Sequence, residues 1–237
     1  MEVHGIFIVE LNKALRTPGC PICNIRDQAS DRYFRFFLHE NVNDVATRII
    51  LQGSLGFCKK HAWQCQEMEA RDYQDGMKHG ILYEWLLQTI LKKIPEIKQN
   101  LLAPEEPQSR FWQKKKSGQN SSPLTRTRYC PVCVSENEAE RLYLRLLING
   151  LSDAKILTAY QAGDGLCLPH FIKAMNLEIE KEPLLMLCDL QMTRIKGLIP
   201  HLTSYVEKHD YQNQESYTEE ELDSWIKAVQ IMAGNKD

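Results

Sequence analysis

CPIC at residues 20–23 and CKKH at residues 58–61 return later in the chain as CPVC at residues 130–133 and CLPH at residues 167–170. The two CPxC motifs lie 110 positions apart, and the two CxxH motifs lie 109 positions apart. Chance does not account for this match, because the cysteines and histidines of the motifs occur in the same order and at nearly the same spacing in both copies. The sequence therefore predicts a tandem duplication.

The surroundings of the motifs repeat as well. Tyr33 and Tyr143 each lie ten residues after the second cysteine of their CPxC motif, and a glycine stands two residues before each CxxH motif. The stretch between the copies is rich in proline, serine and lysine, which is typical of a linker. We divide the chain into a first helical repeat (1–102), a polar linker (103–128) and a second helical repeat with a C-terminal helix (129–237).

The hydrophobic pattern predicts helices. Ile25, Ala29, Tyr33 and Phe37 recur at intervals of four, and the second copy keeps the same helical rhythm. Asp44 and Asp153 are candidate N-caps for a short helix in each copy, and TEEE at 218–221 has the form of a capping box. Because no segment sustains the alternation of a strand, we expect an all-α fold, with a small helical domain present twice.

Composition limits the classes of function. The formal net charge is −2, which argues against a general affinity for nucleic acid phosphates. No stretch reaches the roughly 18–20 apolar residues that span a bilayer, and the N-terminus lacks the basic start of a secretion signal. We therefore expect a cytoplasmic protein, and cysteines in that reducing compartment are more often metal ligands than disulfides.

The repeated cysteines and histidines have the spacing of metal ligands. CPxC brings two thiolates together in a turn, and cysteine and histidine three residues apart share a face of a helical turn. Pro169 fits only a first helical turn, so the CxxH motif is expected at a helix start. Three cysteines and one histidine match a closed tetrahedral zinc site. The sequence predicts two zinc ions per chain, one in each repeat, bound by Cys20, Cys23, Cys58 and His61 and by Cys130, Cys133, Cys167 and His170.

Other interpretations of these residues remain open. An iron–sulfur cluster with Cys3His ligation is chemically possible. A thioredoxin-like dithiol and buried cysteines without metal fit the pattern less well. A rival zinc arrangement is interleaved, with residues 20–23 sharing an ion with residues 167–170. Cys65 and Cys188 have no partner in the other repeat, and we assign them to the hydrophobic core.

The order of these motifs resembles a bacterial family of unknown function, DUF6062. The resemblance rests on an N-terminal amphipathic segment, CPxC, a tyrosine-containing helix, the stretch from Asp44 to Arg48, and GFCxxH at 56–61, all followed by a second copy. The second copy has Ile156 and Leu157 near the place of the Thr47–Arg48 pair. The resemblance implies the duplicated architecture and no particular activity.

The sequence favours a non-enzymatic, zinc-stabilised module for interaction or regulation, whose partner is an unidentified macromolecule, most simply a protein. Four protein ligands per ion leave no open position for a substrate. One alternative is a sensor of oxidants or metals that acts through its thiols. Another is an enzyme with a pocket between the repeats that uses Asp44 and Arg48, which helical spacing places on one face.

Overall fold

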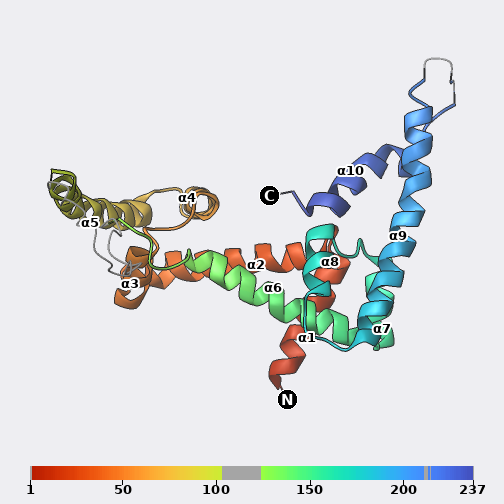
Figure 1. Cartoon of the computed structure of the whole chain (residues 1–237), viewed down its shortest axis with the longest axis horizontal. Helices are drawn as coiled ribbons and strands as arrows, with labels where there is room; N and C mark the ends of the chain where they lie inside the picture. Colours follow the sequence, from red (N-terminus) through yellow and green to blue (C-terminus); the bar gives the residue numbers. More distant parts are fainter. Residues whose placement is uncertain (1, 103–123, 211–212, 214, 237) are drawn as a thin grey trace, which may run out of the picture. The chain divides into compact units, whose positions relative to one another are not determined.

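The computed structural model describes residues 2–102, 124–210, 213 and 215–236 (Figure 1). The regular structure of these residues is helical, and no strand occurs among them, which confirms the expected all-α fold. The α-helices are α1 (Glu2–Arg16), α2 (Pro21–Phe36), α3 (Val45–Gly53), α4 (Lys59–Asp72), α5 (Met77–Leu102), α6 (Pro131–Gly150), α7 (Ala154–Ala162), α8 (Leu168–Met175), α9 (Lys181–Glu207) and α10 (Glu219–Ala233), and a π-helical turn, η1 (Phe37–Asn41), follows α2.

The duplication is visible in the order of the helices. Helices α2 to α5 correspond to α6 to α9, and both α3 and α7 have nine residues. Asp44 caps α3 by accepting a hydrogen bond from the Thr47 amide at 2.7 Å, and Asp153 caps α7 through the Lys155 amide at 2.7 Å. The predicted N-caps are therefore confirmed, and each starts the helix that leads toward a CxxH motif.

The chain folds into two compact units. Unit 1 consists of Met1–Ala29 and Glu136–Asp237, and unit 2 consists of Ser30–Ser135. The boundaries fall inside α2 and α6, so they do not coincide with the predicted ranges 1–102, 103–128 and 129–237. Residues 103–123 of the predicted linker lie outside the described residues. Each unit combines segments from both repeats.

The core of unit 1 forms around the second half of α6. Leu144, Leu147 and Ile148 are buried there with Leu11 of α1. Tyr160 of α7 is also buried, and its hydroxyl accepts a hydrogen bond from the Leu166 amide at 3.1 Å. This hydrogen bond fixes the residue next to Cys167.

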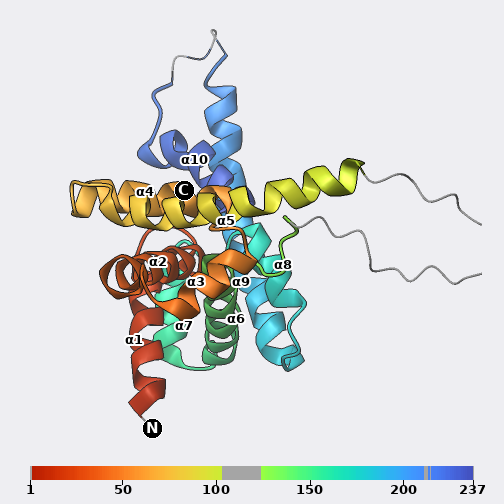
Figure 2. The same ribbon diagram turned by 90° about the vertical axis from the view of Figure 1, so that its left-hand side faces the viewer.

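The core of unit 2 is aromatic. Phe34 in the last turn of α2 and Phe37 at the start of η1 both pack edge-on against Phe57, with ring centroids 5.5 and 5.2 Å apart. Phe57 immediately precedes Cys58. Helices α4 and α5 lie side by side in this unit (Figure 2). The aromatic cluster therefore holds the first CxxH motif near the C-terminal end of α2.

Helix α10 packs on α8 and α9 within unit 1 (Figure 1). Its predicted capping box is confirmed, because Thr218 accepts from the Glu221 amide while the Glu221 carboxylate accepts from the Thr218 amide. The same carboxylate accepts hydrogen bonds from Ser204 at 2.6 Å and from Lys208 at 2.9 Å, both near the end of α9. Polar interactions thus tie the start of α10 to α9.

Within the described ranges, every helix is too short or too polar to cross a membrane.

Candidate metal centres

The eight predicted ligands assemble into two clusters of three cysteines and one histidine. Site A consists of Cys20, Cys23, Cys167 and His170, and site B consists of Cys58, His61, Cys130 and Cys133. In each site the candidate ligand atoms all lie within 4.8 Å of one another. The ligand sets are nevertheless exchanged between the repeats, so the prediction of one complete site within each repeat is wrong, and the interleaved alternative describes the structure.

The exchange follows from the length of α2. A helix of 16 residues spans about 24 Å, and Cys20 and Cys23 lie at its start. Phe34 and Phe37, at the other end, pack against Phe57 and so place the CxxH motif of the same repeat there. The two halves of one predicted ligand set therefore lie by opposite ends of the same helix.

The second repeat obeys the same rule. Cys130 and Cys133 lie at the start of α6, whose later residues pack with Leu166, the residue before Cys167. Each CPxC motif consequently forms its cluster with the CxxH motif of the other copy. The sequence contains both possible pairings, and only the packing of the CxxH motif against the far end of its own helix decides between them.

Site A has the dimensions of a tetrahedral ion site. With zinc–sulfur bonds of about 2.3 Å and zinc–nitrogen bonds of about 2.0–2.1 Å, a tetrahedron separates two sulfurs by about 3.8 Å and a sulfur from a nitrogen by about 3.6 Å. Nδ1 of His170 lies 3.4, 3.5 and 3.1 Å from the sulfurs of Cys20, Cys23 and Cys167. The sulfurs of Cys23 and Cys167 are 3.9 Å apart.

Site B has matching dimensions. Nδ1 of His61 lies 3.2, 3.6 and 3.3 Å from the sulfurs of Cys58, Cys130 and Cys133. The sulfurs of Cys58 and Cys133 are 3.7 Å apart. In both sites the distances between ligand atoms suit a single metal ion at the centre of the cluster.

Helix starts position the second ligand pair of each site. Cys58 and Cys167 are the N-cap residues of α4 and α8, and Pro169 lies in the first turn of α8, as predicted. The preceding Gly56 and Gly165 have φ of +84° and +66°. This left-handed turn favours glycine and aims the next cysteine toward the cluster.

Each site contains one thiol whose pKa is lowered. Hydrogen bonds from Cys167 and Cys20 lower the pKa of Cys23, whereas burial raises the pKa of Cys20. In site B burial alone would raise the pKa of Cys130, but hydrogen bonds from His61 and nearby amides outweigh it and bring the pKa to about 6. Each cluster is thus prepared to present a thiolate, and a metal ion requires all three thiols to be deprotonated.

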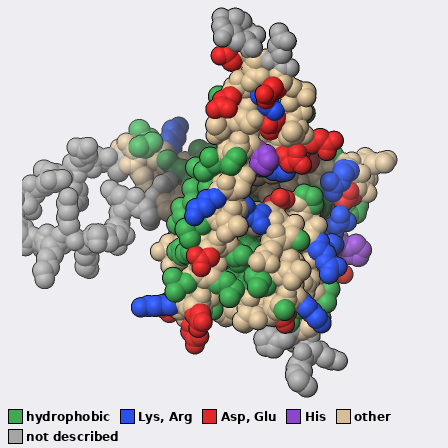
Figure 3. All heavy atoms as spheres, turned by 90° about the vertical axis from the view of Figure 1, so that its right-hand side faces the viewer, with side chains coloured by type: hydrophobic (Ala, Val, Ile, Leu, Met, Phe, Trp, Pro, Cys, Tyr) green, Lys and Arg blue, Asp and Glu red, His purple; other side chains and the backbone are tan. Residues whose placement is uncertain are grey.

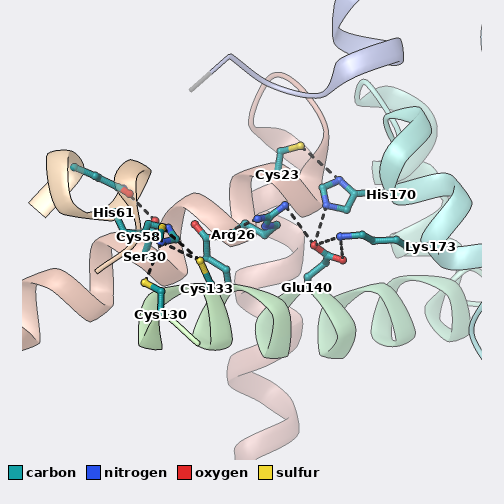
Figure 4. A network of polar contacts seen from close by, with 12 residues as sticks. Cys23, Arg26, Ser30, Cys58, His61, Cys130, Cys133, Glu140, His170 and Lys173 are labelled. Carbon is teal, nitrogen blue, oxygen red and sulfur yellow. Dashed lines mark hydrogen bonds and ion pairs between the residues drawn. The ribbon is translucent and has the colours of Figure 1, made fainter. Parts of the chain in front are cut away.

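A charged shell surrounds site A (Figure 4). The carboxylate of Glu140 on α6 points toward His170, with its oxygen 3.4 Å from Nε2. Lys173 approaches the same carboxylate at 2.6 Å and Arg26 at 3.5 Å, and Arg26 also pairs with Glu136 at 2.9 Å. Burial alone would raise the pKa of Glu140, but the nearby His170 and the hydrogen bond from Lys173 outweigh it and lower the pKa. Glu140 therefore stays ionised and holds the imidazole with Nδ1 toward the cysteines.

The C-terminal segment covers site A. Asn235 Oδ1 accepts a hydrogen bond from the Cys20 amide at 2.7 Å, and Asn235 Nδ2 donates to Asn24 Oδ1 at 2.7 Å. The neighbouring Gly234 has φ of +98°, and a Cβ added there would lie 3.0 Å from the sulfur of Cys23. Only glycine allows the chain to pass this close to the cluster.

The other residues singled out in the sequence have structural roles. Arg48 donates to the Val42 carbonyl at 3.0 Å and to Asn43 Oδ1 at 2.7 Å, while Asp44 serves as the cap of α3. Cys65 is fully buried in the core of unit 2. Cys188 is partly buried and donates to the Met175 sulfur at 3.7 Å. Neither cysteine joins a cluster.

Comparison with known proteins places this architecture in a family. The family of unknown function DUF6062 matches residues 3–237. The chain belongs to the DUF6062 family. It is also similar to an uncharacterised 23.9 kDa protein from the xynA 3′ region of Caldicellulosiruptor sp. (strain Rt8B.4), with 26% identity over 219 residues, which cover 92% of this chain and 96% of that protein. No solved structure matches the chain.

Sequence reasoning missed the shell of this DUF6062 protein. Glu136 and Glu140 were recognisable, because acidic residues there occupy the face of α6 that the helical pattern assigns to the core. Asn235 carries no such signal, since it lies beyond the repeat and has no counterpart in the first copy.

Proposed function

We propose that this DUF6062 protein is a non-enzymatic helical scaffold that holds one zinc ion in each site and presents its surface to another protein. The observation that carries the proposal is the pair of Cys3His clusters whose edges match one tetrahedral ion each. Four protein ligands complete the coordination of zinc and leave no position for a reacting molecule. Such a site contributes to folding rather than to catalysis.

The same distances weigh against an iron–sulfur cluster. The ligands of a cluster bind different iron atoms, so the cluster holds them farther apart than a single ion does. The donor atoms of both sites fit within 4.8 Å. A single metal ion therefore fits these sites better than a cluster does. Zinc is the ion we propose, because thiolates are soft ligands that bind it well.

Each ion would close a long loop of the chain. Cys23 and Cys167 are 144 residues apart, and Cys58 and Cys133 are 75 residues apart. Loop closure costs entropy that grows with the logarithm of loop length, and a bound ion offsets that cost only in the folded state. The ions therefore lock the two repeats together.

The surface suits a protein partner better than a nucleic acid. On the face that Figure 3 draws, Lys and Arg side chains are interspersed with Asp and Glu side chains instead of forming a basic patch. Apolar side chains on α10 are half exposed, among them Trp225 at 51% and Val229 at 58%. Apolar exposure without a concentration of positive charge is typical of surfaces that contact proteins. The enzymatic alternative loses support because Asp44 and Arg48 are engaged in local hydrogen bonds.

Metal analysis of purified protein tests this proposal. We expect about two zinc ions per chain by elemental analysis and native mass spectrometry. Cys20→Ser and Cys167→Ser should each remove the same ion, and Cys58→Ser and Cys130→Ser should each remove the other. Cys188→Ser is the matched control, because this cysteine lies outside both clusters, and it should retain both ions. Folded protein without metal would refute the proposal, and iron in place of zinc would correct the identity of the ion.

A further inference from the structure

The two sites differ in how their cysteines meet solvent. In site A, Cys20 and Cys167 are buried, and only Cys23 is partly exposed. In site B, Cys58 and Cys133 are both partly exposed, and only Cys130 is buried. Site B therefore has two partly exposed cysteines, and site A has one.

The C-terminal segment shields Cys23, the one partly exposed cysteine of site A. Gly234 passes so close that an added Cβ would be 3.0 Å from the Cys23 sulfur and 3.6 Å from the Cys167 sulfur. Asn235 holds this segment in place through the Cys20 amide and Asn24. Oxidation of site A consequently requires the C-terminal segment to move first.

The shells differ at equivalent positions of the repeat. The counterpart of Glu140 in the first copy is Ser30, and the counterpart of Lys173 is Gln64. Gln64 donates to the Ser30 hydroxyl at 3.1 Å, so a hydroxyl and an amide stand where site A has a carboxylate between Arg26 and Lys173. An anionic shell that orients the histidine strengthens metal binding, and its loss commonly costs about 10–100-fold in affinity.

From these three differences we propose that site B is an oxidant-responsive zinc site, in which Cys58 and Cys133 form a disulfide and release the ion, while site A keeps its zinc. The proposal rests on zinc occupancy as set out above. It adds a modification site to the scaffold, with peroxide as the class of oxidant.

The disulfide forms in two steps, each of which transfers sulfur electrons to a peroxide oxygen. A thiolate of the pair attacks hydrogen peroxide, the O–O bond breaks, and a sulfenic acid and hydroxide form. The second thiolate attacks the sulfenic sulfur, the S–S bond forms, and a second hydroxide leaves. Two electrons pass from the two sulfurs to the peroxide oxygens, and two protons convert the hydroxides to water. The sulfurs start 3.7 Å apart and must approach to about 2.05 Å. Only Cys130 and His61 would then remain to hold the ion, too few to keep it bound.

The test treats zinc-loaded, full-length protein with hydrogen peroxide while a coloured chelator reports free zinc. We expect one equivalent to leave at least ~10-fold faster than the second, in line with the effect of a lost shell. Peptide mapping after the fast phase should find a Cys58–Cys133 disulfide and unmodified Cys20, Cys23 and Cys167.

A variant pair tests the role of the cover. Asn235→Ala should speed release of the second equivalent, because it frees the segment over Cys23. Asn12→Ala, which removes a partly exposed asparagine of α1 whose side chain donates to the Ile8 carbonyl, should leave both rates unchanged. Equal rates for both equivalents in the native protein, or an initial Cys23–Cys167 disulfide, would overturn the proposal. Protein that contains no zinc before peroxide is added would instead refute the proposed function on which it rests.

Discussion

At the scale of single residues, both histidines turn Nδ1 toward their cysteines and leave Nε2 to the surrounding shell. This choice gives Glu140 its role, because a metal-bound imidazole carries its remaining proton on Nε2 and donates it to the nearest acceptor. The contrast between Glu140 and its counterpart Ser30 shows that the duplication preserved the ligands while the shell diverged.

The first prediction at this scale concerns Glu140→Gln. The substitution keeps the size of the side chain and removes the charge that holds His170, so zinc affinity at site A should fall about 10–100-fold. Competition with a chelator of known affinity measures this change. Glu138→Gln on the exposed side of the same helix is the control and should have no effect. Equal affinities in the two variants would mean that the carboxylate only satisfies Lys173 and Arg26.

The second prediction compares two glycine substitutions. Gly234→Ala places a Cβ against the sulfur of Cys23 and forces φ near +98° on a residue with a side chain, at a cost of about 1–3 kcal/mol in the free energy of unfolding. Gly197→Ala lies within α9, where an added Cβ meets no atom within 4 Å. Alanine there should stabilise the protein by about 0.5–1 kcal/mol. Denaturant unfolding of zinc-loaded protein measures both changes, and the same sign for both would contradict the close approach at Gly234.

At the scale of helices, much could be predicted from the sequence. The N-caps at Asp44 and Asp153, the capping box at Thr218 and the helix start at Pro169 depend on a few adjacent residues, and all four are present. The same patterns led to the wrong pairing of the ligand sets, because the pairing depends on which end of α2 the chain returns to. That choice is made by the packing of Phe34 and Phe37 against Phe57, which is 20 or more residues away along the chain.

The prediction at this scale concerns Glu221. Hydrogen bonds from Ser204 and Lys208 lower its pKa from 4.5 to about 2. Because the pKa is depressed in the folded state, the carboxylate contributes stability above about pH 4.5, and this contribution is lost as the pH falls toward 2. At pH 7, Glu221→Gln should therefore reduce hydrogen-exchange protection of residues 219–233 relative to the native protein.

Native protein and variant must be compared at each pH, because acid also protonates the cysteine ligands. The difference in protection between native protein and Glu221→Gln should shrink as the pH falls below 4.5. Glu219→Gln is the control, since that exposed side chain belongs to the same helix turn. A difference that persists unchanged at pH 3 would show that Glu221 acts through its shape and not its charge.

At the scale of the whole molecule, the chain is duplicated in sequence but not divided into two independent halves. Each compact unit draws on both repeats, and each candidate metal site joins the CPxC motif of one copy to the CxxH motif of the other. The repeat was readable because it is a property of the sequence, whereas the compact units depend on packing between residues far apart in the chain. Exchange of equivalent elements makes the two copies interdependent.

The last prediction follows from this interdependence. Suppose that a protease site is inserted in the linker 103–128 and that the folded, zinc-loaded protein is cut there. The two fragments should elute together in size-exclusion chromatography, because the proposed ion of site A would join residues 20–23 on one fragment to residues 167–170 on the other. The proposed ion of site B would likewise join residues 58–61 to residues 130–133. A strong chelator at pH 6, where protonation of histidine and cysteine already weakens binding, should then separate them.

Loss of the ions should unfold the helices rather than only loosen their packing, because zinc binding contributes as much free energy as a whole domain has in net stability. Structural zinc binding contributes roughly 10–16 kcal/mol at neutral pH in small folds, and a domain is stable by about 5–15 kcal/mol. Removal of both ions should therefore abolish most of the helical circular dichroism of the cut protein, and zinc at pH 7.5 should restore it together with coelution. Uncut protein treated in the same way is the control, and it shows how much of the helical circular dichroism an intact linker preserves. Fragments that separate while each still holds one zinc ion would mean that the ligands pair within the repeats after all.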